Sequence, residues 1–317
     1  LGARMVPFAG YEMPVQYPAG IMAEHNHTRE KAGLFDVSHM GQALLNGPDF
    51  ATTAAALEAL VPVDVASLEP GQQRYSQLLN NDGGIIDDLM IARSAHPGMK
   101  GGLYLVVNAS RKHDDFAHLR QHLPESCVLE ELPDLALLAL QGPRAEAVLD
   151  ALIPGVAKLT FMHGQAFTFD GAVIYITRSG YTGEDGYEIS VPADKAQALW
   201  NTLTAQEDVL PIGLGARDSL RLEGGLCLYG NDIDTGTSPV EAALEWAIQK
   251  VRRNGGAREG GFPGAARILE ELDNGAARRR VERQRAERQC RRTGRHADGM
   301  GDAQSVAKAR FEGRQGR

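Results

Sequence analysis

The sequence predicts an α+β fold. Within residues 1–250, short apolar runs alternate with turns that carry Gly and Pro, and a few amphipathic stretches lie between them. Several of the apolar runs follow one another without a helix between them, which favours antiparallel pairing of neighbouring strands. At 317 residues, the chain is long enough for about two domains and a large buried core.

Three segments have the features of helices. They are Ile21 to Gly33, where Gly33 suits a helix end, Pro143 to Leu152, where Pro suits a first turn, and Asp194 to Ala205, where Asp194 suits an N-cap. Strands are predicted where short runs are rich in β-branched or large apolar residues. These runs are Tyr75–Leu79, Ile85–Ala92, Leu103–Asn108, Leu135–Leu140, Ala172–Thr177 and Tyr187–Val191.

The composition excludes several classes of protein. With 43% hydrophobic and 23% charged residues, the chain is close to the average globular protein and unlike collagen, mucin-like stalks or disordered chains. No apolar stretch approaches the roughly 18 residues of a membrane span, and no basic-then-apolar leader opens the sequence. Cys127, Cys227 and Cys290 form no CxxC pair, which argues against a disulfide framework or a zinc site and favours a reducing compartment.

The charge is unevenly distributed along the chain, whose net value is -8. Acidic residues dominate residues 1–250, whereas basic residues dominate residues 251–317. From Arg278 onward, the only large apolar residues are Val281, Met300, Val306 and Phe311, too few to close a core. We therefore predict that residues 251–317 are a linker followed by an Arg-rich, disordered tail. A basic arm that binds nucleic acid is the alternative, disfavoured because no aromatic residues are interleaved with the arginines.

The first motif with chemical potential is Gly83-Gly84-Ile85-Ile86-Asp87-Asp88-Leu89-Met90. The turn sequence before it predicts a β-hairpin from Tyr75 to Ala92. Because side chains alternate across a strand, Asp87 and Asp88 are expected to point to opposite faces, so that at most one serves a given pocket. An acid that caps the strand or pairs with an arginine is the alternative interpretation.

The second motif is the loop Thr177-Arg178-Ser179-Gly180-Tyr181-Thr182-Gly183-Glu184-Asp185-Gly186-Tyr187-Glu188. Its glycines allow the backbone to approach a ligand, and Tyr181 offers a stacking face. The Glu188 carboxylate, on the strand beyond, suits the two parallel N–H donors of a flat heterocycle such as a pterin or guanine. A hairpin turn with surface acids is equally compatible with these residues.

Other motifs carry less chemistry. Gly213-Leu214-Gly215-Ala216-Arg217-Asp218 lacks the third glycine of a dinucleotide fingerprint, and no clear parallel strand precedes it. His25 and His27 do not face each other on a helix, which disfavours a metal site. No GxSxG or GxxxxGK[ST] motif supports hydrolase or phosphoryl-transfer chemistry.

Taken in order, seven motifs of residues 1–250 resemble the aminomethyltransferase, or T-protein, family of the glycine cleavage system. They are the segments from Met5 to Pro14 and from Gly33 to Gly41, the GGIIDDLM run, Gln141-Gly142-Pro143, the RSGYTGEDGYE run, GLGARD, and Leu228-Tyr229-Gly230-Asn231-Asp232. The resemblance implies the cloverleaf fold of that family, with two interleaved α/β subdomains in residues 1–250 and a C-terminal β-barrel around a folate pocket. The tail lacks the alternating apolar strands of such a barrel, so we expect the barrel to be incomplete or absent and the tail to be a frame-shifted remnant of it.

The resemblance also implies an activity. The family takes the aminomethyl group from the lipoyl arm of the H-protein, releases ammonia and yields 5,10-methylenetetrahydrofolate. Asp88 falls at the family's catalytic aspartate and Glu188 at the acid that holds the pterin edge. Tyr75 and Tyr181 fall at aromatic contacts, Asn108 at a pocket position and Arg217 at a polar folate contact. No metal is implied, and the expected location is the cytoplasm, or the mitochondrial matrix if the source is eukaryotic.

Two alternatives share this fold. One is a folate-binding relative without transferase activity, of the iron–sulfur maintenance type, but the cysteine motif of those relatives is absent. The other is a folate-dependent demethylase module, which is normally fused to a flavin oxidase that this sequence does not contain. Retention of the DDLM acids favours the aminomethyltransferase.

Overall fold

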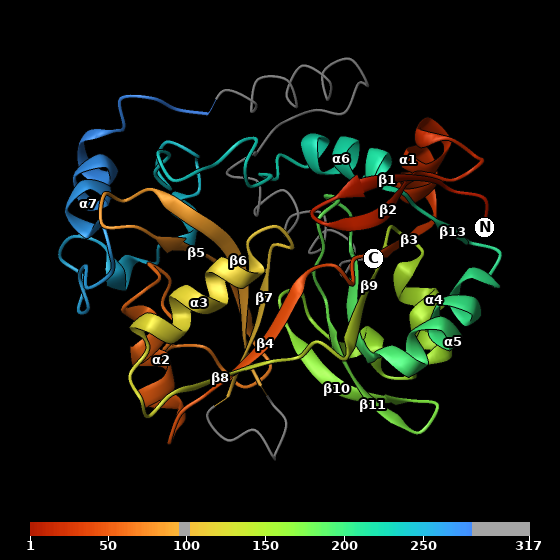
Figure 1. Cartoon of the computed structure of the whole chain (residues 1–317), viewed down its shortest axis with the longest axis horizontal. Coiled ribbons are helices and arrows are strands. Elements are labelled where there is room, and N and C mark those ends of the chain that lie inside the picture. Colours follow the sequence, from red (N-terminus) through yellow and green to blue (C-terminus); the bar gives the residue numbers. More distant parts are fainter. Residues whose placement is uncertain (95–101, 281–317) are drawn as a thin grey trace. The chain divides into compact units, whose positions relative to one another are not determined.

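The computed structural model describes residues 1–94 and 102–280 (Figure 1). These residues form two compact units: unit 1 comprises Leu1–His39 and Asp134–Leu226, and unit 2 comprises Met40–Pro133 and Cys227–Arg280. Each unit is therefore assembled from two separate stretches of the described chain. Both units pack helices against a largely antiparallel sheet, which confirms the predicted α+β class.

Unit 1 is organised around a six-stranded sheet with the order β10-β11-β12-β9-β3-β13. Every neighbouring pair is antiparallel except β13 and β3, which are parallel. The strands are β3 (Ala32–Asp36), β9 (Leu135–Gln141), β10 (Gly164–Phe169), β11 (Ala172–Thr177), β12 (Gly186–Pro192) and β13 (Val209–Pro211). A hairpin of β1 (Arg4–Phe8) and β2 (Tyr11–Gln16) forms a separate two-stranded sheet.

The core of unit 1 lies between this sheet and two of its helices. The helices of the unit are α1 (Ile21–Glu30), α4 (Ala145–Leu152), α5 (Ala193–Thr204) and α6 (Leu214–Glu223). Leu149 of α4 and Leu199 of α5 are fully buried and join the same cluster as Leu140 and Ile189 of the sheet. Removal of this apolar surface from water, worth about 25 cal/mol per Å², is what holds the two helices on the sheet.

The carboxylate of a buried glutamate from α1 contacts the N-terminus of α6. Glu24 is fully buried, and its carboxylate accepts hydrogen bonds from the backbone N–H groups of Tyr17 at 2.6 Å and Gly213 at 2.7 Å. A parallel strand, β13, does precede the Gly213 motif, contrary to the sequence-based expectation. Because Glu24 already accepts an N–H that a phosphate would need, the rejection of a dinucleotide site stands.

Unit 2 is organised around a five-stranded antiparallel sheet with the order β5-β6-β7-β4-β8. Its strands are β4 (Gly41–Asn46), β5 (Gln73–Leu79), β6 (Ile85–Arg93), β7 (Leu103–Val107) and β8 (Val128–Glu131). Helices α2 (Phe50–Glu58) and α3 (Lys112–His122) pack on the sheet through Leu57 and Phe116. The predicted hairpin is confirmed, since β5 pairs antiparallel with β6 across a turn in which Gly83 has φ +77°.

Residues 227–280 form a second cluster against the β5–β6 hairpin. They contain α7 (Ala265–Asn274) and short 3-10 turns at Glu245–Ala247 and Lys250–Arg252. Phe262 and Ile268 are buried there together with Ile85, and the buried Arg252 bonds Glu58 on α2. The prediction that residues 251–280 belong to a linker and tail is thus wrong: they are packed, because their apolar side chains complete a core begun elsewhere in the chain. Residues 281–317 of the predicted tail lie outside the described residues.

The predicted elements agree with the structure in kind and differ at their ends. Gly33 lies inside β3 rather than at the end of α1, and a Cβ atom there would lie 2.4 Å from Thr28 Oγ1. Asp194 lies in the first turn of α5, whose N-cap is Pro192. Among the described helices, none has the length and apolar character needed to cross a membrane. No closed β-barrel is found in residues 1–94 and 102–280.

Candidate active site

Unit 2 gathers a set of polar side chains at one end of its sheet, which we call the acid cluster. Its members come from β5, β6, the end of β7 and α3, and are Tyr75, Asp87, Asp88, Asn108 and Asp115. Strand register explains the position of Asn108. Leu89 lies opposite Val107, so Asn108, the first residue beyond β7, lies beside the carboxylates of β6.

Two donors hold the Asp88 carboxylate. Asn108 Nδ2 donates to Asp88 Oδ1 at 2.6 Å, and the Tyr75 hydroxyl donates to Asp88 Oδ2 at 3.0 Å. The Asn108 amide also donates to Asp87, from Nδ2 to Oδ1 at 2.9 Å and from the backbone N–H to Oδ2 at 3.1 Å. Asp87 is fully buried whereas Asp88 keeps some exposure, in the alternation expected of neighbouring strand residues. Asn108 can bond both because it lies just past the strand end.

The surroundings of Asp88 favour its neutral form more than water does. The pKa of Asp88 is raised to about 7: burial is the largest cause, the nearby Asp87 carboxylate adds to it, and the hydrogen bonds from Tyr75 and Asn108 oppose both effects. No arginine among residues 1–94 and 102–280 forms an ion pair with Asp88. The alternative in which this acid simply pairs with an arginine therefore finds no support. A carboxyl group that titrates near neutral pH is suited to proton transfer.

A stacked pair of aromatic rings lies at the acid cluster. The Tyr75 ring stacks on Trp246, with the ring centroids 5.2 Å apart and the planes at 29°. Burial raises the pKa of Tyr75 well above its ordinary value, with the Asp88 carboxylate as a second cause, so its hydroxyl remains a donor at neutral pH. The role of Trp246 was not predicted, because it lies in a 3-10 turn far from Tyr75 in sequence.

In unit 1, the second motif forms a hydrogen-bonded connection between β11 and β12. Arg178 is buried and bonds Asp185 with both ends of its guanidinium, at 3.1 Å from Nε and 2.5 Å from Nη2. Gln141, also fully buried, donates from Nε2 to the Ser179 carbonyl at 2.9 Å and accepts at Oε1 from the Thr182 hydroxyl at 3.0 Å. The loop is thus cross-linked by side chains at both ends, which preorganises it for a ligand.

Gly180 allows the close approach between this loop and Gln141. A Cβ atom at position 180 would lie 1.7 Å from Gln141 Oε1. We expect Gly180→Ala to lower the free energy of unfolding by about 1–3 kcal/mol, because the buried amide must move and break its bonds to the loop. Gly236→Ala is the matched control, since a Cβ atom there meets nothing closer than 3.4 Å and φ is not positive. Equal urea midpoints for the two variants would contradict this account.

Glu188 lies on β12 beside the loop. Its Oε2 accepts a hydrogen bond from the Ser179 hydroxyl at 3.0 Å, and Ser179 is held in turn by Thr177 at 3.0 Å. Burial raises the pKa of Glu188, and the Ser179 hydroxyl and the Arg217 guanidinium oppose that rise. Arg217 lies over the Tyr181 ring at 4.7 Å from its centroid, as expected of a cation–π contact. One Glu188 oxygen has a protein donor, so the carboxylate keeps capacity to accept from a ligand.

The structure thus brings the predicted site residues together in two groups. Tyr75, Asp88 and Asn108 meet in unit 2, and Tyr181, Glu188 and Arg217 meet in unit 1. Four supporting residues were not predicted from the sequence, namely Gln141, Ser179, Trp246 and Asp115. Only Gln141 and Ser179 had a local signal, as parts of motifs already recognised. Within the described part of the chain, no cluster of three or more His, Cys, Asp or Glu side chains is arranged to hold a metal ion.

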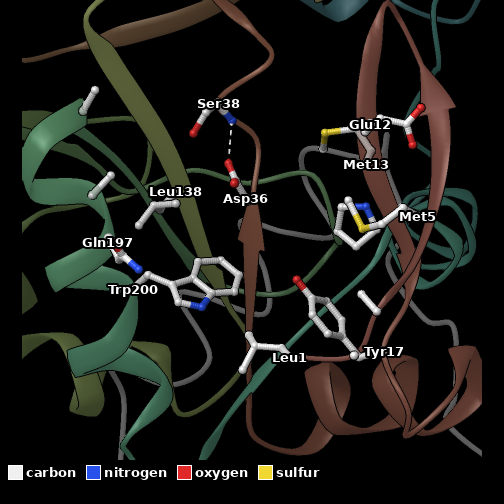
Figure 2. Close-up of a pocket in the computed structure, with 15 residues that line it drawn as sticks. Leu1, Met5, Glu12, Met13, Tyr17, Asp36, Ser38, Leu138, Gln197 and Trp200 are labelled. Carbon is white, nitrogen blue, oxygen red and sulfur yellow. Dashed lines mark hydrogen bonds between the residues drawn. The ribbon is translucent and has the colours of Figure 1, made fainter.

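A hollow of about 690 Å³ lies elsewhere in unit 1, beside the β1–β2 hairpin (Figure 2). Its lining includes Met5, Met13, Tyr17 and Trp200. The Asp36 carboxylate, which also lines it, accepts a hydrogen bond from the Ser38 N–H at 3.0 Å. None of the predicted site residues lines this hollow. This hollow is therefore separate from the residues predicted to carry the chemistry.

Comparison with known proteins identifies the class. The family model described as the GCVT N-terminal domain matches residues 1–252. The crystal structure of glycine cleavage system aminomethyltransferase T from Bartonella henselae superposes with a TM-score of 0.80 at 46% identity, covering 88% of this chain and 74% of that one. The protein is thus a GCVT-domain protein, with the fold that the sequence motifs implied.

Curated relatives narrow the class further. The mitochondrial aminomethyltransferase of Dictyostelium discoideum is 43% identical over 298 residues, which cover 89% of this chain and 71% of the relative. The aminomethyltransferase of Synechococcus elongatus is 43% identical over 282 residues, which cover 88% and 73%. The chain belongs to the aminomethyltransferase family of the glycine cleavage system, and the resemblance drawn from its motifs is confirmed.

Proposed function

We propose that this protein transfers the aminomethyl carbon from the lipoyl arm of the H-protein to tetrahydrofolate, with release of ammonia and formation of 5,10-methylenetetrahydrofolate. Membership of the family supports the aminomethyl transfer. The observation that supports the residue assignment is the Asp88 carboxyl group, held by two donors and titrating near pH 7. We further propose a location in the cytoplasm, or in the mitochondrial matrix if the source is eukaryotic.

The reaction needs positioning and proton transfer. The C–N and C–S bonds of the S-aminomethyl group break, and new C–N bonds form to N5 and N10 of the folate. Two protons leave those nitrogens, one with ammonia and one with the lipoyl thiol. Asp88, placed near N10, would accept a proton and stabilise the transient cationic carbon electrostatically. Asn108 and Tyr75 would keep the carboxylate in the required orientation.

Binding of the folate would rest on the other predicted residues. Glu188 would accept two parallel N–H bonds from the pterin edge, which suits a carboxylate with free acceptor capacity. Tyr181 and Tyr75 would supply aromatic contacts, and Arg217 a polar contact. The preorganised loop at residues 178–185 supports this assignment, because its order does not have to be created on binding.

The assay that tests the function follows ammonia release from aminomethylated H-protein, with and without tetrahydrofolate. We expect rapid ammonia release that depends on tetrahydrofolate, together with formation of methylenetetrahydrofolate. Folate binding without any transfer would instead favour a folate-binding relative that lacks the activity. Absence of both would overturn the proposed function.

The pKa of Asp88 predicts the pH dependence. The pKa is raised to about 7 in the folded protein, and the ionised form is the one that accepts the proton. Activity is therefore lost as pH falls through 7, and kcat/KM at pH 6 should be about tenfold lower than at pH 8. Steady-state rates between pH 5.5 and 8.5, with the aminomethylated H-protein varied at concentrations below its KM, would measure this. A profile without a limb in this range would contradict the role assigned to Asp88.

A further inference from the structure

Asp87, the neighbour of Asp88 on β6, forms a pair of acids with Asp115. The proposed reaction assigns no role to this pair. Asp115, on α3, and Asp87, on β6, are both fully buried and lie within hydrogen-bonding reach of each other. Neither Asp115 oxygen receives an N–H or O–H donor from any residue of the described chain. Asp87, by contrast, accepts two hydrogen bonds from Asn108.

Two adjacent buried carboxylates cannot both be ionised, because each charge lacks water and repels the other. One proton between them removes the repulsion and supplies the donor that the pair lacks. The proton belongs on Asp115, because Asp87 already has two N–H donors that favour its ionised form, whereas Asp115 has none. Asp115 is then a neutral acid whose O–H donates to Asp87.

The charges around the pair agree with this assignment. The pKa of Asp115 is raised to about 10, with burial as the largest cause and with contributions from Asp87 and Asp114. Arg111 opposes the rise, but its guanidinium pairs with Asp114 at 2.8 Å. The Tyr229 hydroxyl, whose own pKa is raised by burial and by both acids of the pair, stays neutral beside them.

The pair is linked to Asp88 through a single amide group. Asn108 Nδ2 donates to both Asp87 Oδ1, at 2.9 Å, and Asp88 Oδ1, at 2.6 Å. The ionised Asp87 carboxylate therefore fixes the plane of the amide, and the amide fixes one oxygen of Asp88. Any change of charge on Asp87 reaches Asp88 both through this amide and directly through space.

We propose that Asp115 is a positioning residue for aminomethyl transfer: as a neutral buried acid it donates an O–H hydrogen bond to Asp87, which keeps Asp87 ionised and thereby orients Asn108 and Asp88. The inference rests on the proposed role of Asp88. It predicts that what matters at position 115 is a hydrogen-bond donor, and that a side chain which only fills space does not suffice.

Two substitutions separate these possibilities. Asp115→Asn keeps a hydrogen-bond donor in nearly the same place, so kcat should stay within about threefold of that of the unaltered protein. The acid limb of the pH profile, where activity falls as pH is lowered, should not move. Asp115→Ala removes the donor, and Asp87 then takes up the proton itself. We expect kcat to fall by about 10- to 100-fold as Asp88 loses its alignment. The acid limb should also move to lower pH, because Asp88 no longer faces a charged neighbour.

A spectroscopic measurement tests the proton without any turnover. Infrared spectra of the unliganded protein at pH 8 should contain the carbonyl stretch of a protonated carboxylic acid, and this band should be missing from Asp115→Asn. The inference is overturned if the two spectra do not differ in that region, if Asp115→Asn is as impaired as Asp115→Ala, or if Asp115→Ala has unchanged kcat and pH profile. Should Asp115→Ala fail to fold, the Asp115→Asn spectrum and rate still decide.

The same design separates this inference from the proposed function. If the unaltered protein releases no ammonia from aminomethylated H-protein, the proposed function fails, whereas the infrared band still reports where the proton lies. If the unaltered protein is active and the two Asp115 variants behave alike, the inference fails and the proposed function stands.

Discussion

Replacement of Asp88 by Asn should abolish aminomethyl transfer while leaving folate bound. Asn keeps the size of the side chain and an oxygen that can accept from Tyr75 or Asn108, so the acid cluster is expected to keep its shape. It cannot accept a proton or carry negative charge at the reacting carbon. Loss of a general base costs about 10²–10⁴ in rate, and kcat should fall by at least that amount. Stopped assays of ammonia and methylenetetrahydrofolate would measure the loss, and titration with tetrahydrofolate would measure binding.

Asp82→Asn is the matched control, because Asp82 lies in the turn of the same hairpin and is exposed. Its kcat should equal that of the unaltered protein. Full turnover by Asp88→Asn would remove the role assigned to this carboxylate, even if folate binding were normal. Loss of folate binding together with kcat would instead place Asp88 among the binding residues.

Replacement of Glu188 by Ala should chiefly weaken tetrahydrofolate binding. The carboxylate is the one predicted contact able to accept two N–H donors, and hydrogen bonds to a charged group contribute about 1.5–3 kcal/mol each. The dissociation constant should therefore rise by about 10- to 100-fold, with a smaller change in kcat at saturating folate. Equilibrium fluorescence or calorimetric titration of the purified protein would measure the change.

The control for this variant is Glu207→Ala, which removes an exposed carboxylate from the same unit. It should bind folate as the unaltered protein does. An unchanged dissociation constant for Glu188→Ala would contradict the assignment of the pterin-edge contact. The dissociation constant of Glu188→Gln should lie between those of the unaltered protein and Glu188→Ala, because the amide keeps one acceptor but presents a donor where the second acceptor is needed.

Much of the fold followed from local patterns. The hairpin of β5 and β6 was predicted because an Asn-, Asp- and Gly-rich turn separates two apolar runs, and pairing across such a turn is local. The short strand β13 and the packed residues 251–280 were not predicted. The three residues of β13 form a strand because they pair with β3. Phe262 and Ile268 are buried because the β5–β6 hairpin, far away in sequence, supplies the other side of their core.

The sequence alone determined the family and the fold class, and it predicted the two acids on which the proposed chemistry rests, because its motifs are contiguous runs in which spacing and residue type carry the information. Only the tertiary structure decided what surrounds those acids. Asn108 beside Asp88, Trp246 against Tyr75 and the buried Asp115 behind Asp87 come from different elements of the chain. Orientation, burial and the pKa of a carboxyl group depend on atoms close in space, whatever their separation in sequence.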